Sequence, residues 1–98
     1  MFDNLKLSDH AKTSQYEVKD YMQSLGYKCH LEHKVEDRYD GRNGRIDIVC
    51  YKEKEIVAIE VDNRTPRKNS IYKLKNFKAN KKYIICRNGY ILEIKGDE

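Results

Sequence analysis

Hydrophobic residues follow two spacings along the chain, one typical of helices and one typical of strands. Within residues 9–25 they recur at i, i+3, i+4 and i+7 from Val18 onward, which predicts a helix with one apolar face. Gly26 follows at the position where glycine commonly ends a helix. A second, shorter helix, starting at Thr65-Pro66 or at Asn69-Ser70, is predicted from the spacing of Ile71, Leu74 and Phe77.

Between and after these helices the pattern is that of β-strands. Segments 45–51 and 55–62 are rich in β-branched residues and almost continuously apolar, as in central strands that are covered on both faces. The short polar connection Lys52–Glu55 predicts that they form a hairpin. Further strands are predicted at 27–36, 82–87 and 90–95, the last two joined by a tight turn at Asn88-Gly89. The predicted order of elements is α-β-β-β-α-β-β.

Two carboxylates interrupt the apolar hairpin. Asp47 and Glu60 each lie between two aliphatic residues, and a charge inside a buried strand is costly unless a partner satisfies it. If Tyr51 pairs with Ile56, counting back along both strands places Asp47 directly across from Glu60. Asp62 lies two residues beyond Glu60, so its side chain points to the same side of the strand.

Three neighbouring carboxylates at the end of a hairpin predict a metal site. Carboxylates this close repel one another in a dry environment, and a hard divalent cation with oxygen ligands removes that repulsion. The alternative is that Asp47 or Glu60 forms an ion pair with Arg45 or a lysine, or is exposed on an edge strand.

The composition is that of one small intracellular domain. The 98 residues predict a single domain, 1–98, in which residues 1–8 and 96–98 are loose. No apolar run approaches the roughly 20 residues of a membrane span, and the start of the chain has no secretory apolar region. The 3 cysteines are widely spaced without a CxxC motif, which predicts free thiols used as small apolar residues. We therefore expect a cytoplasmic protein with reduced cysteines and no membrane contact.

The charges are distributed unevenly. Residues 63–82 contain 8 basic residues and no acidic one. A basic block that directly follows a carboxylate-bearing strand suits a phosphate polyanion. A lysine-rich helix face that is simply solvated explains the composition equally well.

The residues of the hairpin resemble those of a nuclease family. Gly44-Arg45-Ile46-Asp47-Ile48-Val49, a short hairpin and then Ile59-Glu60-Val61-Asp62 look like the core of the PD-(D/E)XK nuclease superfamily. The resemblance spans residues 10–95 and is nearest in kind to minimal archaeal Holliday-junction resolvases and small phage or mobile-element nucleases. It implies a restriction-endonuclease-like α/β (α+β) fold with a central mixed sheet flanked by two helices.

The resemblance also implies a function and a set of ligands. The protein would be a metal-dependent endonuclease that hydrolyses phosphodiester bonds in DNA with Mg²⁺ or Mn²⁺. Asp47, Glu60 and the backbone carbonyl of Val61 would bind the metal. Glu17 would match the acidic residue that many members carry on the first helix, where it contacts metal-bound water.

The chain departs from the family pattern at one position. Asp62 stands where the family usually has a lysine. Some members with a carboxylate there are active, and Asp62 would then act as general base or as a further ligand. Other members supply the lysine from the following helix, for which Lys73 or Lys75 is the candidate. The third alternative is a degenerate site that binds nucleic acid without cutting it.

The basic residues provide candidates for contacts with nucleic acid. The expected partner is DNA rather than RNA, and a homodimer is plausible because cutting both strands of a duplex usually requires two sites. Besides a nuclease, a catalytically inactive nucleic-acid-binding module and a small regulatory protein that binds an acidic partner remain open. The candidate contact residues are Arg38, Arg42, Arg45, Arg64, Arg67, Lys68 and Lys75.

Overall fold

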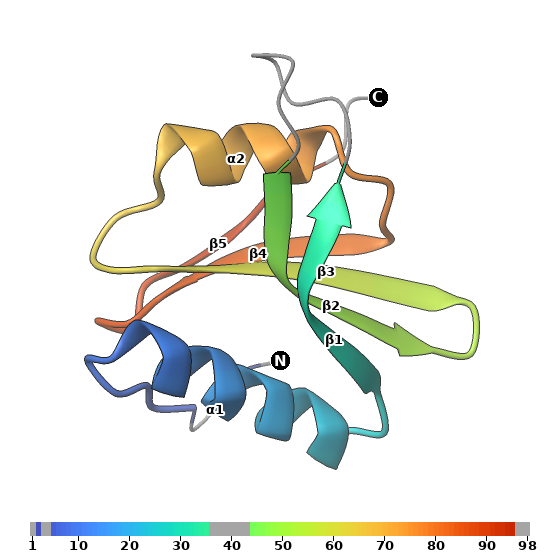
Figure 1. Cartoon of the computed structure of the whole chain (residues 1–98), viewed down its shortest axis with the longest axis horizontal. Helices are drawn as coiled ribbons and strands as arrows, with labels where there is room; N and C mark the ends of the chain where they lie inside the picture. Colours follow the sequence, from blue (N-terminus) through green and yellow to red (C-terminus); the bar gives the residue numbers. More distant parts are fainter. Residues whose placement is uncertain (1, 3–4, 36–43, 96–98) are drawn as a thin grey trace.

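A computed structural model describes residues 2, 5–35 and 44–95, and in this part of the chain a five-stranded sheet is flanked by two helices (Figure 1). The order of elements confirms the predicted α-β-β-β-α-β-β arrangement. The elements are α1 (Ala11–Ser24), β1 (Lys28–Val35), β2 (Gly44–Lys52), β3 (Glu55–Asp62), α2 (Lys68–Lys75), β4 (Lys81–Cys86) and β5 (Ile91–Glu93).

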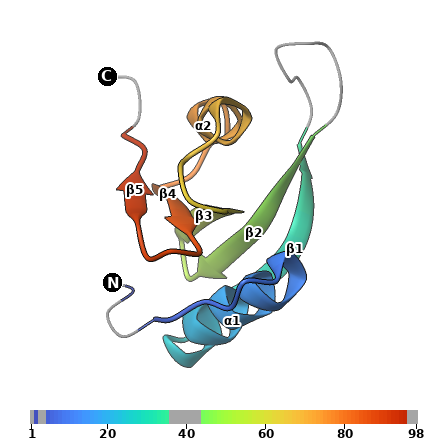
Figure 2. The same ribbon diagram turned by 90° about the vertical axis from the view of Figure 1, so that its left-hand side faces the viewer.

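The sheet is mixed, and its strands follow the order β1-β2-β3-β4-β5. Strands β1, β2 and β3 form an antiparallel meander, and β4 pairs with β5 in antiparallel fashion. Strands β3 and β4 are parallel, because the connection through α2 returns the chain to the edge of the sheet at which β3 begins. The two helices cover opposite faces of the sheet (Figure 2). The chain therefore has the predicted α+β class with a mixed sheet between two helices.

Each face of the sheet has its own apolar core. On the α1 face, Val18 and Met22 pack with Ile48, Ile59 and other residues of the central strands. On the α2 face, the apolar cluster consists of Ile46, Val49, Ala58, Leu74, Ile84, Cys86 and Ile94. Because both faces are covered, β2 and β3 are apolar at almost every position, as their sequences predicted.

The end of α1 follows the expected glycine signal. Gly26 has φ of +96°, a conformation that side chains rarely adopt. Its N–H donates to the carbonyl of Gln23, and the N–H of Tyr27 donates to the carbonyl of Met22, which together form a Schellman motif. No helix in the described part of the chain has the length and apolar content needed to cross a membrane.

Candidate functional site

The hairpin of β2 and β3 has the register that the sequence predicted. Tyr51 pairs with Ile56, and Lys52 pairs with Glu55. β3 spans the predicted residues, whereas β2 extends one residue further than expected at each end, to Gly44 and Lys52, so the connection between the strands is only two residues long. The regular ladder continues to Ile48 and Ile59 and stops there. The next rung by count would join Asp47 to Glu60.

At that rung the two carboxylates take over the contact between the strands. The backbone N–H of Asp47 donates to Glu60 Oε2 at 2.7 Å. The backbone N–H of Val61 donates to Asp47 Oδ2 at 2.8 Å. Each side chain thus accepts a hydrogen bond from the opposite strand, and the pair holds the ends of β2 and β3 together. We refer to Asp47 and Glu60 as the carboxylate pair.

The sheet is also irregular on the other side of Asp47. The pairing of β1 with β2 omits Glu32 and Asp47, although the rungs on both sides keep the same register. Glu32 has φ of +52°, a conformation that is uncommon for a residue with a side chain. Ile46 and Val49 pack in the same cluster although they are three positions apart, an odd spacing that in a regular strand places side chains on opposite faces, so the strand changes face between them. This local distortion frees the backbone N–H of Asp47 to bind the Glu60 carboxylate.

Lys73 brings α2 into contact with the carboxylate pair. Its ammonium lies 2.5 Å from Glu60 Oε1 and donates a hydrogen bond to the carbonyl of Arg45 at 2.7 Å. The side chain of Lys73 is 16% exposed and that of Glu60 only 1%. The neighbouring Leu74 is fully buried in the α2-face core, which fixes the rotation of this short helix. Lys75 is exposed, so of the two lysines considered from the sequence, Lys73 is the one that meets the pair.

Burial dominates the electrostatics of the pair. It raises the pKa of Glu60 to about 7, and the negative charge of Asp47 adds to this increase, while Lys73 opposes it. Burial also raises the pKa of Asp47, against the hydrogen bond from Val61 and the charge of Lys73. The single ammonium therefore does not fully offset the burial of the two carboxylates.

Asp62 is directed towards α2. Its Oδ2 accepts a hydrogen bond from the backbone N–H of Arg67 at 2.9 Å, and its Oδ1 accepts from Ser70 Oγ at 3.0 Å. The Nε of Arg67 also donates to Oδ1 at 3.2 Å. Arg67 is the N-cap residue of α2 and provides no side-chain cap of its own, and Asp62 of β3 holds this end of the helix by accepting from the Arg67 amide and the Ser70 hydroxyl. The helix starts at Lys68, between the two predicted starts.

The contacts of Asp62 change the predicted set of ligands. The sequence predicted three carboxylates around one ion, whereas the Asp62 side chain is fully buried and satisfied by the first turn of α2. Within residues 2, 5–35 and 44–95, no three His, Cys, Asp or Glu side chains gather as a metal site. The carboxylate pair thus provides two acidic side chains without a third.

Glu17 lies apart from the carboxylate pair. Its Oε1 accepts a hydrogen bond from the backbone N–H of Ser8 at 2.8 Å. Its helix, α1, covers the face of the sheet opposite α2 (Figure 2). No hydrogen bond or ion pair found in the described part of the chain joins Glu17 to Asp47 or Glu60.

The other candidate residues differ in their surroundings. Arg45 is exposed and forms an ion pair with Glu32 at 3.1 Å. Arg67 is largely exposed, although it binds Asp62. Val61 contacts the carboxylate pair through its backbone amide, which donates to Asp47. Arg38 and Arg42 lie outside the described residues. Arg64 precedes α2, Lys68 begins it and Lys75 ends it, and all three side chains are exposed.

One contributor escaped the sequence prediction. Ser70 is fully buried and lies one helical turn before Leu74, on the side of α2 that packs on the sheet. A hydroxyl on the buried side of a short helix needs an acceptor, and Asp62 provides it. The spacing of Ser70 and Leu74 was therefore a signal that the Ser70 hydroxyl lies on the buried side of the helix and needs an acceptor there.

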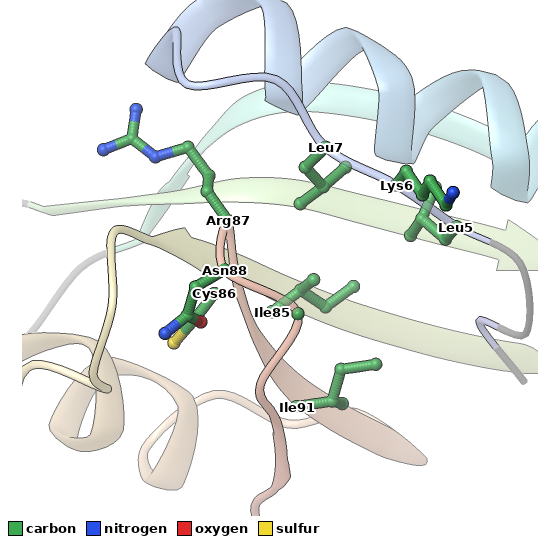
Figure 3. Close-up of a pocket in the computed structure, with 9 residues that line it drawn as sticks. Leu5, Lys6, Leu7, Ile85, Cys86, Arg87, Asn88 and Ile91 are labelled. Atoms are coloured by element: carbon green, nitrogen blue, oxygen red, sulfur yellow. The ribbon is translucent and has the colours of Figure 1, made fainter.

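A cavity of about 290 Å³ lies elsewhere, between the N-terminal segment and the turn that joins β4 to β5. Figure 3 shows the apolar side chains of Leu5, Leu7, Ile85 and Ile91 around it. None of the residues of the carboxylate pair or of α2 lines this cavity. It is therefore separate from the candidate site.

Comparisons of the chain with protein-family models, with curated proteins and with solved structures gave no significant match in any of the three. The function proposed below therefore depends on the geometry, burial and charge of the site.

Proposed function

We propose that this protein is a metal-dependent nuclease that hydrolyses phosphodiester bonds in DNA. The observation that carries the proposal is the arrangement of Asp47, Glu60 and Lys73, in which a buried carboxylate that is paired with an ammonium lies beside a half-buried one. Carboxylates arranged in this way bind hard divalent cations, and an ammonium beside them is suited to a phosphate oxygen.

The carboxylate pair would hold Mg²⁺ or Mn²⁺ together with the backbone carbonyl of Val61. The pKa of Glu60 is raised to about 7 and that of Asp47 is also raised, so a cation would compete with the proton that Glu60 partly retains near neutral pH. When bound, the ion would polarise the phosphate and lower the pKa of a water molecule. Lys73 would donate hydrogen bonds to the phosphate oxygen on which negative charge develops.

Asp62 would position Lys73 instead of taking part in the chemistry. Its carboxylate holds the first turn of α2 through Arg67 and Ser70, and Lys73 follows Ser70 by less than one turn. In the family that the hairpin resembles, a lysine usually stands in the place of Asp62. The exchange of that lysine for a helix-holding aspartate fits a site whose lysine comes from α2.

The DNA would lie over the basic surface around α2. Arg64, Lys68 and Lys75 are exposed on the chain that leads into and along this helix, and Arg67 lies among them. Basic side chains in this position would bind backbone phosphates near the carboxylate pair. Arg45 would join this surface from β2 once it leaves Glu32.

The test is cleavage of supercoiled, linear and branched DNA, with and without Mg²⁺ or Mn²⁺. We expect metal-dependent cutting that disappears in Asp47→Asn and Glu60→Gln and is strongly reduced in Lys73→Met. Lys75→Met is the matched control, because it removes a lysine of the same helix that does not touch the pair. Cutting that persists in Glu60→Gln would show that a contaminant or another site is responsible.

One observation favours a second function, an inactive nucleic-acid-binding module. Glu60 Oε2, Asp47 Oδ2 and Glu60 Oε1 each already have a partner within the protein, namely two backbone amides and Lys73. Carboxylates whose oxygens are bound within the protein can have the purely structural role of joining the ends of β2 and β3. Salt-sensitive DNA binding without cutting under any metal condition would support this function over the nuclease.

A further inference from the structure

Two cysteines face each other on neighbouring strands. Cys29 of β1 pairs with Cys50 of β2, and their sulfur atoms lie 2.9 Å apart. All three thiols of the chain are free in the structure. Cys50 is fully buried, while Cys29 is partly exposed at the edge strand. The sequence predicted three separate apolar thiols and gave no indication of this pair, because 20 residues lie between the two.

The backbone geometry suits a disulfide at this rung. Lys52 and Glu55 flank a two-residue turn and so form a hydrogen-bonded rung with β3. In a regular strand every second residue directs its N–H and C=O to the same side, so Cys50, two residues before Lys52, directs these groups towards β3. Cys29 and Cys50 therefore form a non-hydrogen-bonded rung of β1 and β2. Such rungs have Cα atoms about 4.5 Å apart, within the range that disulfides span. The sulfurs need to approach by about 0.9 Å to reach the bond length of about 2.0 Å.

We propose that Cys29 and Cys50 form an oxidisable dithiol site that reacts with small disulfides such as glutathione disulfide and becomes a reversible cross-strand disulfide. Its evidence is independent of the proposed nuclease activity. Cys29 is the entry point, because it is the more exposed residue of the two. Cys86, which is buried on β4, is the thiol that stays reduced.

The reaction is a two-step thiol–disulfide exchange. The Cys29 thiol gives its proton to solvent, and the thiolate attacks one sulfur of the small disulfide, whose S–S bond breaks. The released thiolate takes up a proton. Cys50 then loses its proton and attacks Cys29 Sγ, which releases the second small thiol after protonation. Both cysteine sulfurs are oxidised, and both sulfurs of the small disulfide are reduced.

The surroundings of the thiols set the rate of this exchange. Burial raises the pKa of Cys29 and of Cys50 above the usual thiol range. Because the thiolate is the attacking species, the reaction is slow near neutral pH and accelerates as the pH rises.

The experiment equilibrates the native chain of 98 residues with mixtures of reduced and oxidised glutathione and counts thiols after unfolding under acid quench. We expect the count to fall from 3 to 1, with loss of two hydrogen atoms from the intact mass and a peptide linking Cys29 to Cys50. The oxidised protein should melt at least about 5 °C higher, because the crosslink restricts the unfolded chain.

Two comparisons make the result decisive. In concentrated guanidinium chloride the same mixtures should form the Cys29–Cys50 bond at least about tenfold less readily, because strand pairing no longer holds the thiols together. Cys86→Ser should behave like the wild type, whereas Cys29→Ser should keep both remaining thiols. Three thiols in the native protein at all glutathione ratios, or a bond that involves Cys86, would overturn the proposal. Peptide mapping of the wild type gives this answer even if a serine variant folds poorly.

Discussion

Lys73 and Glu60 form an ion pair between α2 and β3, with 2.5 Å between Nζ and Oε1. Glu60 is buried by the hairpin, but the cation that compensates it comes from a helix that follows in the chain. Asp62 lies two residues after Glu60 on the same strand and binds Ser70 in the first turn of α2, the helix that carries Lys73.

The first prediction concerns the two lysines of α2. Lys73→Met should reduce the cleavage rate about 10²–10³-fold, because it removes a donor directed at the developing charge. Lys75→Met should change the rate less than about threefold, because Lys75 is exposed and lies away from the pair. Single-turnover cleavage at saturating protein measures both. Equal losses in the two variants would assign the lysines to general attraction of DNA.

The second prediction concerns the pH dependence of stability without metal. The folded-state pKa of Glu60 is about 7 against 4.5 for the free side chain, so the folded state binds more protons between these values. Stability contributed by protonated Glu60 is therefore present below pH 4.5 and is lost as the pH rises through 7. The loss amounts to about 3 kcal/mol. Urea unfolding across this range measures it.

A glutamine variant isolates the contribution of Glu60. Glu60→Gln keeps an acceptor for the Asp47 amide but cannot ionise, so its free energy of unfolding should fall less between pH 4.5 and 7 than that of the wild type. Glu93→Gln, at an exposed position, is the control and should retain the wild-type slope. Superimposable profiles for Glu60→Gln and the wild type would show that Glu60 titrates normally.

The third prediction concerns metal binding. Mg²⁺ or Mn²⁺ at a hundred times its dissociation constant should stabilise the native protein by about 2.7 kcal/mol, because only the folded chain presents both carboxylates. The gain should vanish in Asp47→Asn. Thermal scans at constant ionic strength, with sodium salt as the control, measure the effect. A wild-type melting temperature that does not respond to either ion would argue for the closed, inactive arrangement.

The hairpin and its register could be predicted because they depend on local pattern. A polar connection between two apolar strands fixes the pairing of Tyr51 with Ile56, and the position of Asp47 relative to Glu60 follows. The partners of these acids depend on how α2 returns to the sheet. The choice of Lys73 over Lys75 is set by the burial of Leu74, which no strand pattern reveals. The direction of Asp62 likewise follows from where the helix begins.

The fourth prediction separates the structural task of Asp62 from a catalytic one. Asp62→Ala leaves the Arg67 amide and the Ser70 hydroxyl without their acceptor and should cost about 1–3 kcal/mol. Asp62→Asn keeps an acceptor oxygen and should lose less stability. Hydrogen exchange of the α2 amides should accelerate in Asp62→Ala more than exchange in β2. Unchanged protection of α2 would mean that other contacts hold the helix.

Asp62→Asn also tests the chemistry. If Asp62 only positions α2, this variant should retain most of its cleavage activity, with the same pH dependence as the wild type. If Asp62 is the general base, the amide cannot accept the proton, and the rate should fall about 10²–10⁴-fold without a matching loss of stability. The ratio of rate loss to stability loss therefore distinguishes the two roles.

The fifth prediction concerns how DNA is held. Binding should weaken steeply with salt, and removal of one phosphate contact should reduce the slope of log affinity against log salt by about 0.9. Lys68→Gln should have this effect, because Lys68 is exposed at the start of α2 and directly follows Arg67, which binds Asp62. Lys12→Gln is the matched control, because it removes an exposed lysine from α1 on the opposite face of the sheet. Fluorescence anisotropy with labelled DNA over a salt series measures both slopes. A smaller slope for Lys12→Gln and an unchanged slope for Lys68→Gln would place the DNA on the α1 face, away from the carboxylate pair, and would contradict the proposed orientation.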